Sequence, residues 1–94
     1  MSNQQGPQDS GGLKMDFSTF ILSLNASSLI HLGEIHDPQL KERTVNLPAA
    51  KHTIEILEIL EDKTKGNLDD GENKLLKDIL YNLRLKFMQH SKGS

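Results

Sequence analysis

The stretch from Phe17 to Leu32 constrains the fold most, because its only ionisable side chain is one histidine. Placed at about 100° per residue, this stretch is apolar on two opposite sides of a helix. One side holds Phe17, Phe20, Ile21 and Leu24, and the other holds Leu22, Ala26, Leu29 and Ile30. A helix that is apolar on two sides needs two neighbours, so we expect one side to close the protomer and the other to meet a second chain.

A membrane helix is an alternative explanation for residues 17–32. As a helix this stretch would span about 24 Å, whereas a hydrocarbon core requires about 20 residues and 30 Å. A helix at the membrane surface usually carries lysine and arginine on its polar face, and this stretch has neither. We therefore expect no membrane partner and interpret the stretch as a helix buried between protein neighbours.

Length and composition favour one small domain that is stabilised by self-association. The chain has 94 residues, a net charge of -2 and no cysteine. A domain of this size buries only about 60% of its unfolded surface. Without cysteine it forms no disulfide, iron–sulfur cluster or catalytic thiol. Residues 1–14 are polar and lack a secretory signal, so we expect them to form the disordered tail of a cytoplasmic protein. We place a single helical domain at 15–90 and a frayed C-terminal end at 91–94.

Capping residues mark where three helices begin, and we predict these helices at about 17–32, 47–65 and 70–89. Asp16 or Ser18 can accept a hydrogen bond from the first turn of the first helix. Asn46 can cap the second helix. Asp69 and Glu72 form a capping-box pattern ahead of the third helix.

Glycines mark where the first two helices end. Gly33 and Gly66 suit the left-handed conformation that commonly closes a helix. Between the first and second helices, residues 34–46 form a long loop, in which Ile35, Leu40 and Val45 are expected to contact the helices.

Apolar spacing in the second and third helices predicts an all-α fold. The second helix has one broad apolar arc, and the third has a main stripe from Leu76 to Phe87. The third helix also carries a second stripe on another side. We predict a three-helix protomer, a helical hairpin plus the N-terminal helix, that assembles about a two-fold axis into a symmetric bundle. The predicted interface is Leu22, Ala26, Leu29, Ile30, Tyr81, Leu85 and Met88.

Charge is divided between the last two helices. Residues 51–72 contain seven acids and three lysines, whereas residues 74–92 contain five bases and one acid. The pattern is typical of an acidic helix lying antiparallel to a basic one. The basic residues are interspersed with leucines and lack the density of a polybasic tract, so we expect no nucleic-acid partner.

The candidate metal ligands are His31, Glu34 and His36, with Asp37 adjacent. His31 and His36 straddle a predicted helix end and lack the i, i+4 spacing of a helical metal pair. We therefore expect no metal and no cofactor. Catalytic residues are not expected either, because serines inside a regular helix usually bond to the preceding turn and no nucleophile elbow occurs.

Five blocks carry a family resemblance. They are DFSTFILSL at 16–24, HLGEI at 31–35, NLPAAK at 46–51, KTKGNL at 63–68 and LYNLR at 80–84. With these blocks the chain resembles a bacterial family catalogued as domain of unknown function 1844. The resemblance implies a small helical cytoplasmic protein and supplies no catalytic residue.

These observations lead to one main functional hypothesis. We expect a non-enzymatic, homo-oligomeric protein, with a dimer favoured and an unidentified protein as a further partner. A metal-binding or small-ligand-binding protein that uses the corner from His31 to Asp37 is the first alternative. A peripheral membrane or RNA-associated adaptor is the second.

Overall fold

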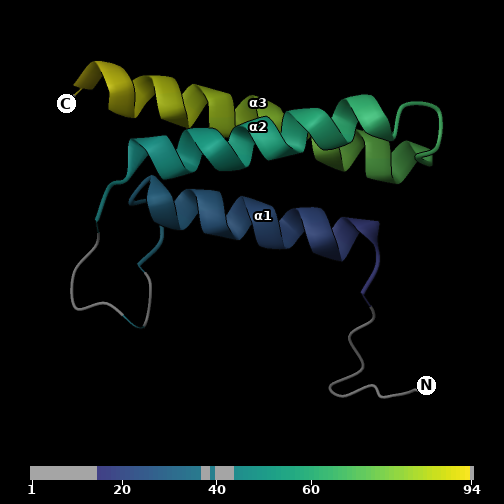
Figure 1. Cartoon of the computed structure of the whole chain (residues 1–94), viewed down its shortest axis with the longest axis horizontal. Helices are drawn as coiled ribbons and strands as arrows, with labels where there is room; N and C mark the ends of the chain where they lie inside the picture. Colours follow the sequence, from purple (N-terminus) through teal and green to yellow (C-terminus); the bar gives the residue numbers. More distant parts are fainter. Residues whose placement is uncertain (1–14, 37–38, 40–43, 94) are drawn as a thin grey trace.

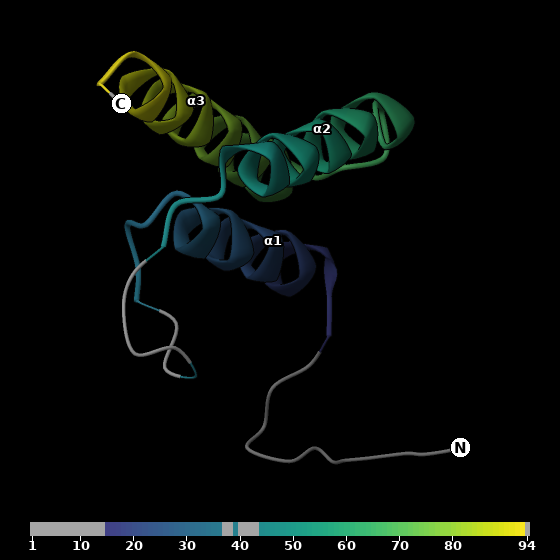
Figure 2. The same ribbon diagram turned by 60° about the vertical axis from the view of Figure 1, so that its left-hand side comes forward.

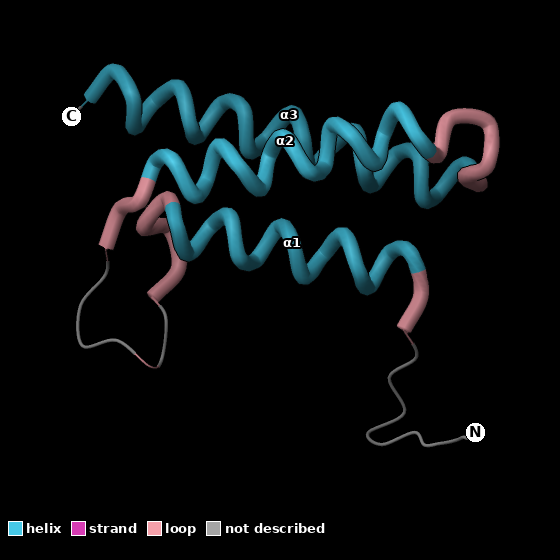
Figure 3. Tube along the Cα trace, in the orientation of Figure 1, coloured by secondary structure: helices cyan, strands magenta, loops and turns pink. Residues whose placement is uncertain are grey.

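The computed structural model describes residues 15–36, 39 and 44–93. The predicted all-α fold is confirmed, since this part of the chain contains three helices and no strand (Figure 3). The helices are α1 (Phe17–His31), α2 (Leu47–Lys63) and α3 (Asp70–Gly93). The predicted tail and Leu40 of the loop lie outside the described residues.

The three helices form an up-down-up arrangement in two layers. In Figure 1, α2 runs antiparallel to α1 and to α3, and α2 and α3 cross near their middles. After the 60° turn in Figure 2, α1 still lies on one side of the α2 and α3 pair. Each helix contacts both others. Because α2 and α3 cross, their ends diverge on either side of the crossing point.

The predicted caps form at the start of each helix. Asp16 Oδ1 and Asn46 Oδ1 accept hydrogen bonds from the backbone N–H three residues later, at 2.8 and 3.1 Å. Asp69 Oδ1 accepts from the Glu72 N–H at 2.7 Å, and Glu72 Oε1 accepts from the Asp69 N–H at 3.0 Å. This reciprocal pair is the predicted capping box, and it satisfies backbone donors that a helix start otherwise leaves unpaired.

The end of α1 is closed by Gly33. Its φ of 77° lies in the left-handed region, as predicted for this glycine. The Gly33 N–H donates to Ile30 O at 3.0 Å, and the Glu34 N–H donates to Leu29 O at 2.9 Å. These two bonds make the Schellman arrangement, in which backbone N–H groups just beyond a helix donate to the free carbonyl groups of its last turn.

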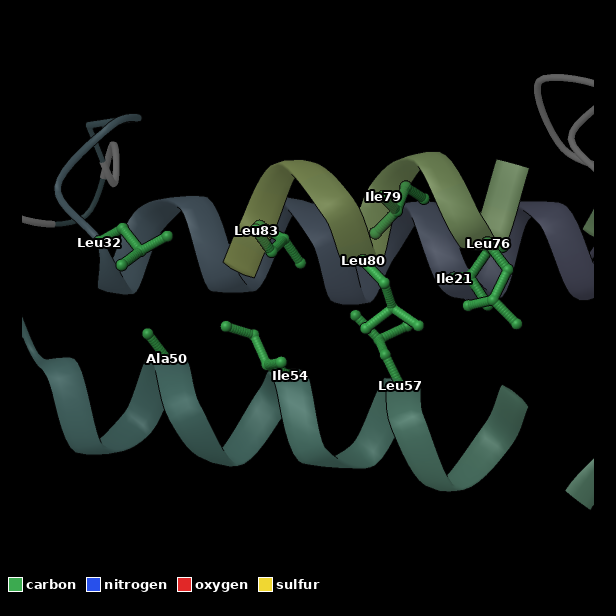
Figure 4. Packing of buried hydrophobic residues seen from close by; sticks show 9 residues of the cluster. All are labelled: Ile21, Leu32, Ala50, Ile54, Leu57, Leu76, Ile79, Leu80 and Leu83. Atoms are coloured by element: carbon green, nitrogen blue, oxygen red, sulfur yellow. The ribbon is translucent and has the colours of Figure 1, made fainter. Parts of the chain in front are cut away.

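The hydrophobic core lies between the three helices (Figure 4). It is aliphatic and draws residues from every helix. The buried members are Ile21, Leu32, Ala50, Ile54, Leu57, Leu76, Ile79, Leu80 and Leu83. The main stripe predicted for the third helix is confirmed by four of these residues, with Phe87 packed at the edge.

Ion pairs join α2 to α3 beside the core. Arg84 Nη2 lies 2.9 Å from Glu58 Oε2, and its Nε donates to the same oxygen at 3.1 Å. Lys77 Nζ lies 3.7 Å from Glu61 Oε2. The predicted pairing of an acidic helix with a basic one is therefore confirmed. Both ion pairs are exposed to solvent, so each contributes little to the free energy of unfolding. Their main effect is to align α2 and α3 along each other.

Ser28 is fully buried on α1, and its hydroxyl has no hydrogen-bond partner among the described residues. Replacing it by alanine removes the cost of burying an unpaired polar group, so Ser28→Ala should stabilise the protein by about 1 kcal/mol. Exposed Ser27, one residue earlier, provides the control, since Ser27→Ala changes only helix propensity. Urea unfolding of both variants tests the difference. If Ser27→Ala stabilises as much as Ser28→Ala, burial of the hydroxyl is not the cause.

Candidate interaction site

The outer face of α1 exposes two large apolar side chains and no charge. Phe20 is 41% exposed and Leu22 is 46% exposed, although both are large and apolar. The other exposed residues of this face are small and uncharged: Ser23, Ala26 and Ser27. From Phe17 to Ile30 the helix carries no ionisable side chain. We call the surface made by Phe20, Leu22, Ser23, Ala26 and Ser27 the α1 outer face.

The structure corrects which residues of α1 face the core. Phe20 was assigned to the core side and is exposed, whereas Leu29 was assigned to the outer side and packs against the core. The reason is Ser28, which lies on the same helical face as Ile21, seven residues earlier, and shares its burial. A pattern of apolar residues does not count Ser28 as part of the core, although Ser28 lies at the centre of the buried face. The face predicted from apolar spacing is therefore rotated by about one position from the observed one. Ile30 is half-buried.

The second stripe of α3 is exposed as a ridge. Tyr81 is 71% exposed, and Leu85 and Met88 are about half exposed. Tyr81 lies two residues from both Ile79 and Leu83, which are buried. Two residues correspond to about 200° around a helix, so the ridge points away from the core and from α1.

The α1 outer face and the α3 ridge lie on opposite sides of the protomer. The α1 helix forms one layer and α3 belongs to the other (Figures 1 and 2), and each surface points away from the core between them. An isologous interface uses one patch on each subunit. A single two-fold axis therefore cannot bring both surfaces into one contact, and the two must be considered as separate sites.

The corner after α1 does not bring the predicted metal ligands together. Glu34 Oε2 lies 2.8 Å from His90 Nε2, and Glu34 Oε1 lies 3.3 Å from Lys86 Nζ, both on α3. His31 ends α1, where its carbonyl accepts from the Asn46 N–H at 2.7 Å. His36 is exposed.

Among the described residues no group of three or more metal-type ligands occurs. Glu34, one of the three candidate ligands, contacts α3 instead of forming a cluster with His31 and His36 among these residues. Asp37 lies outside the described residues. His90, near the end of α3, is a partner of Glu34.

The contacts of Glu34 have two consequences. They hold the end of α3, and they make the free energy of unfolding depend on pH. Hydrogen bonds from His90 and Lys86 lower the pKa of Glu34 below its ordinary value of 4.5. Because this pKa is lowered, ionised Glu34 stabilises the folded state at pH values above its ordinary pKa. The stabilisation is lost as the pH falls through the pKa of Glu34 in the folded state. By anchoring His90, Glu34 holds the last turns of α3, which ends at Gly93 instead of near residue 89.

Glu34→Gln should lower the free energy of unfolding by about 0.5 kcal/mol at neutral pH, as expected for a solvated ion pair. The difference from the parent protein should vanish at a pH below the lowered pKa of Glu34, where its carboxyl group is protonated. Urea unfolding at both pH values measures this. Asp62→Asn is the control, because the Asp62 side chain makes no ion pair among the described residues. A difference for Glu34→Gln that persists in acid would contradict the role of its charge.

A cavity of about 400 Å³ lies at the turn between α2 and α3. Lys65 and Lys77 line it, but so do Glu58, Glu61 and Asp62. Three carboxylates beside two ammonium groups do not favour an anion.

No helix in the described part of the chain is long and apolar enough to cross a membrane. Neither the curated proteins nor the solved structures gave a match to the chain. The family described as domain of unknown function (DUF1844) matches residues 14–89, which confirms the resemblance carried by the five sequence blocks. Since this match covers most of the sequence, the chain belongs to the DUF1844 family.

Proposed function

We propose that this protein is a non-enzymatic, homo-oligomeric interaction module, and that the α1 outer face is its main subunit interface. One observation carries the proposal: the exposed arc of α1 has no charged side chain, and its two edges carry the exposed Phe20 and Leu22. A helix at the surface of a monomer normally presents charged residues to water. An apolar helix face that remains uncovered is typical of a protein interface.

The composition of the α1 outer face also supports close helix packing. Its small residues, Ser23, Ala26 and Ser27, leave room for the backbone of a second helix. The distance between packed helices depends on the side chains at the contact, and small ones permit the shortest approach. Leu22 and Phe20 would then supply most of the apolar area that the contact removes from water.

Leu22→Glu tests this interface directly. Because Leu22 is half exposed, the substitution should leave the protomer folded while placing a carboxylate in the proposed contact. We expect sedimentation velocity to give a lower mass for the variant than for the parent protein at the same concentration. Leu29 is unsuitable for this test, since it packs against the core and its substitution would destabilise the protomer.

Asn82→Glu provides the control, because it adds the same charge at an exposed position of α3. Its mass should equal that of the parent protein. Circular dichroism of both variants checks that the helices persist. An unchanged mass for folded Leu22→Glu would contradict the proposed interface.

A further inference from the structure

An apolar groove of about 350 Å³ opens between the first half of α2 and the second half of α3. The groove lies where the two helices diverge beyond their crossing point (Figure 1). Ile54, Phe87 and Met88 supply its apolar lining. Met88 belongs both to this groove and to the α3 ridge, so a concave apolar surface and a convex one lie side by side.

The charged residues at the rim of the groove divide into two kinds. Glu58 and Arg84 form the ion pair that joins the two helices. Lys51 and Glu55 also line the groove, but both are exposed and neither makes an ion pair among the described residues. They lie four residues apart on α2 and therefore project from neighbouring turns of one face. The rim thus presents one unpaired positive charge and one unpaired negative charge.

We infer that this groove is a second self-association site, which receives the ridge of a second copy about a two-fold axis. In an antiparallel alignment, a two-fold axis passing between Lys51 and Glu55 places Lys51 opposite the partner's Glu55. The same operation places Glu55 opposite the partner's Lys51. The unpaired rim charges are therefore complementary to themselves, which is the requirement for an isologous contact.

The shape of the surface fits the same occupant. Leu85 and Tyr81 continue the ridge from Met88 and are exposed. The same axis brings the Met88 end of each ridge to the opposite groove, so both apolar surfaces leave water together. No additional charged residue is needed to balance the contact, because Glu58 and Arg84 already neutralise each other.

This inference rests on the proposed self-association and extends it to a second surface. Lys51 and Glu55 lie across α2 from buried Leu57, so the groove faces away from α1. The α1 outer face and the groove can therefore be occupied at the same time. Two different two-fold contacts on one protomer build an assembly larger than a dimer, and the smallest closed one contains four copies.

Charge reversal in the Leu22→Glu background isolates the groove from the α1 outer face. We expect Leu22→Glu alone to sediment as a dimer held by the groove. Adding either Lys51→Glu or Glu55→Lys places like charges opposite each other, and we expect dimer dissociation constants at least tenfold higher. Adding both restores opposite charges across the axis and should restore the dimer. Lys63→Glu, exposed on α2 outside the groove, should leave the dimer unchanged.

The outcomes separate the two surfaces. If the parent protein is a dimer and folded Leu22→Glu is a monomer, the groove inference is overturned and the proposed interface on α1 stands. If Leu22→Glu has the parent mass and single charge reversals dissociate it, the groove stands and the α1 proposal fails. If the double reversal dissociates the dimer as much as the single reversals do, Lys51 and Glu55 do not pair across the axis.

Discussion

Replacing Leu57 by alanine should lower the free energy of unfolding by about 3 kcal/mol, the usual cost of a buried leucine-to-alanine change. Leu57 is fully buried near the middle of α2, within the cluster that joins all three helices (Figure 4). The substitution removes apolar contacts and leaves a cavity that the surrounding helices fill only in part. Since small domains have total stabilities of about 5 to 15 kcal/mol, the loss should be large in urea unfolding.

Ile59 provides the matched control for Leu57. It lies two residues later on the same helix and is 58% exposed. Ile59→Ala should cost no more than about 0.5 kcal/mol, since surface substitutions away from the core have small effects. Equal losses for Leu57→Ala and Ile59→Ala would mean that the core lies on another face of α2.

Gly33→Ala should lower the free energy of unfolding by about 2 kcal/mol, for two separable reasons. The φ of 77° is a left-handed conformation that costs an alanine about 1 kcal/mol. An added Cβ would also lie 2.9 Å from Val45 Cγ2, closer than carbon atoms normally approach. Val45 must then shift, and its shift weakens the packing of the loop that leads into α2.

Gly66 allows the two reasons to be separated. Its φ is 85°, but no atom of the described residues beyond its two chain neighbours lies within 4 Å of an added Cβ. Gly66→Ala should therefore show only the conformational cost, about 1 kcal/mol. Adding Val45→Ala to Gly33→Ala removes the close contact and should bring its loss to that of Gly66→Ala. Chemical denaturation of the four proteins measures these values, and equal losses for both single glycine variants would exclude the contact with Val45.

The starts of the three helices could be predicted from sequence because they depend on neighbouring residues. Asn46 and the pair of Asp69 and Glu72 bond to backbone groups three residues away. Gly33 and Gly66 have the positive φ that their positions predicted. Such local interactions do not depend on the tertiary packing. The observed helix starts therefore agree with the predicted ones.

The rotation of α1 could not be predicted from sequence. In an amphipathic helix charged residues mark the outer side, as they do on α2, but α1 has none between Phe17 and Ile30. Both of its sides are apolar enough to be buried. Only the packing against α2 and α3 selects the side that carries Ile21 and Ser28, and this leaves Phe20 exposed and Leu29 covered.

The contacts of Glu34 depend on residues far away in sequence. His90 is separated from Glu34 by 56 residues, and the pairing requires α1 and α3 to run in the same direction. No local pattern contains that information. The spacing of His31, Glu34 and His36 made them candidate metal ligands, although no metal was expected, and it contained no sign that Glu34 contacts Lys86 and His90 near the end of α3.

The mass of the unmodified protein in solution tests the central claim most directly. The protomer has a mass of 10.5 kDa. Sedimentation equilibrium over a range of micromolar concentrations should give at least twice this mass, because the α1 outer face is expected to be covered by a second copy. A single species with the mass of one protomer across the whole range would contradict the proposal that this family member works as a self-associating helical module.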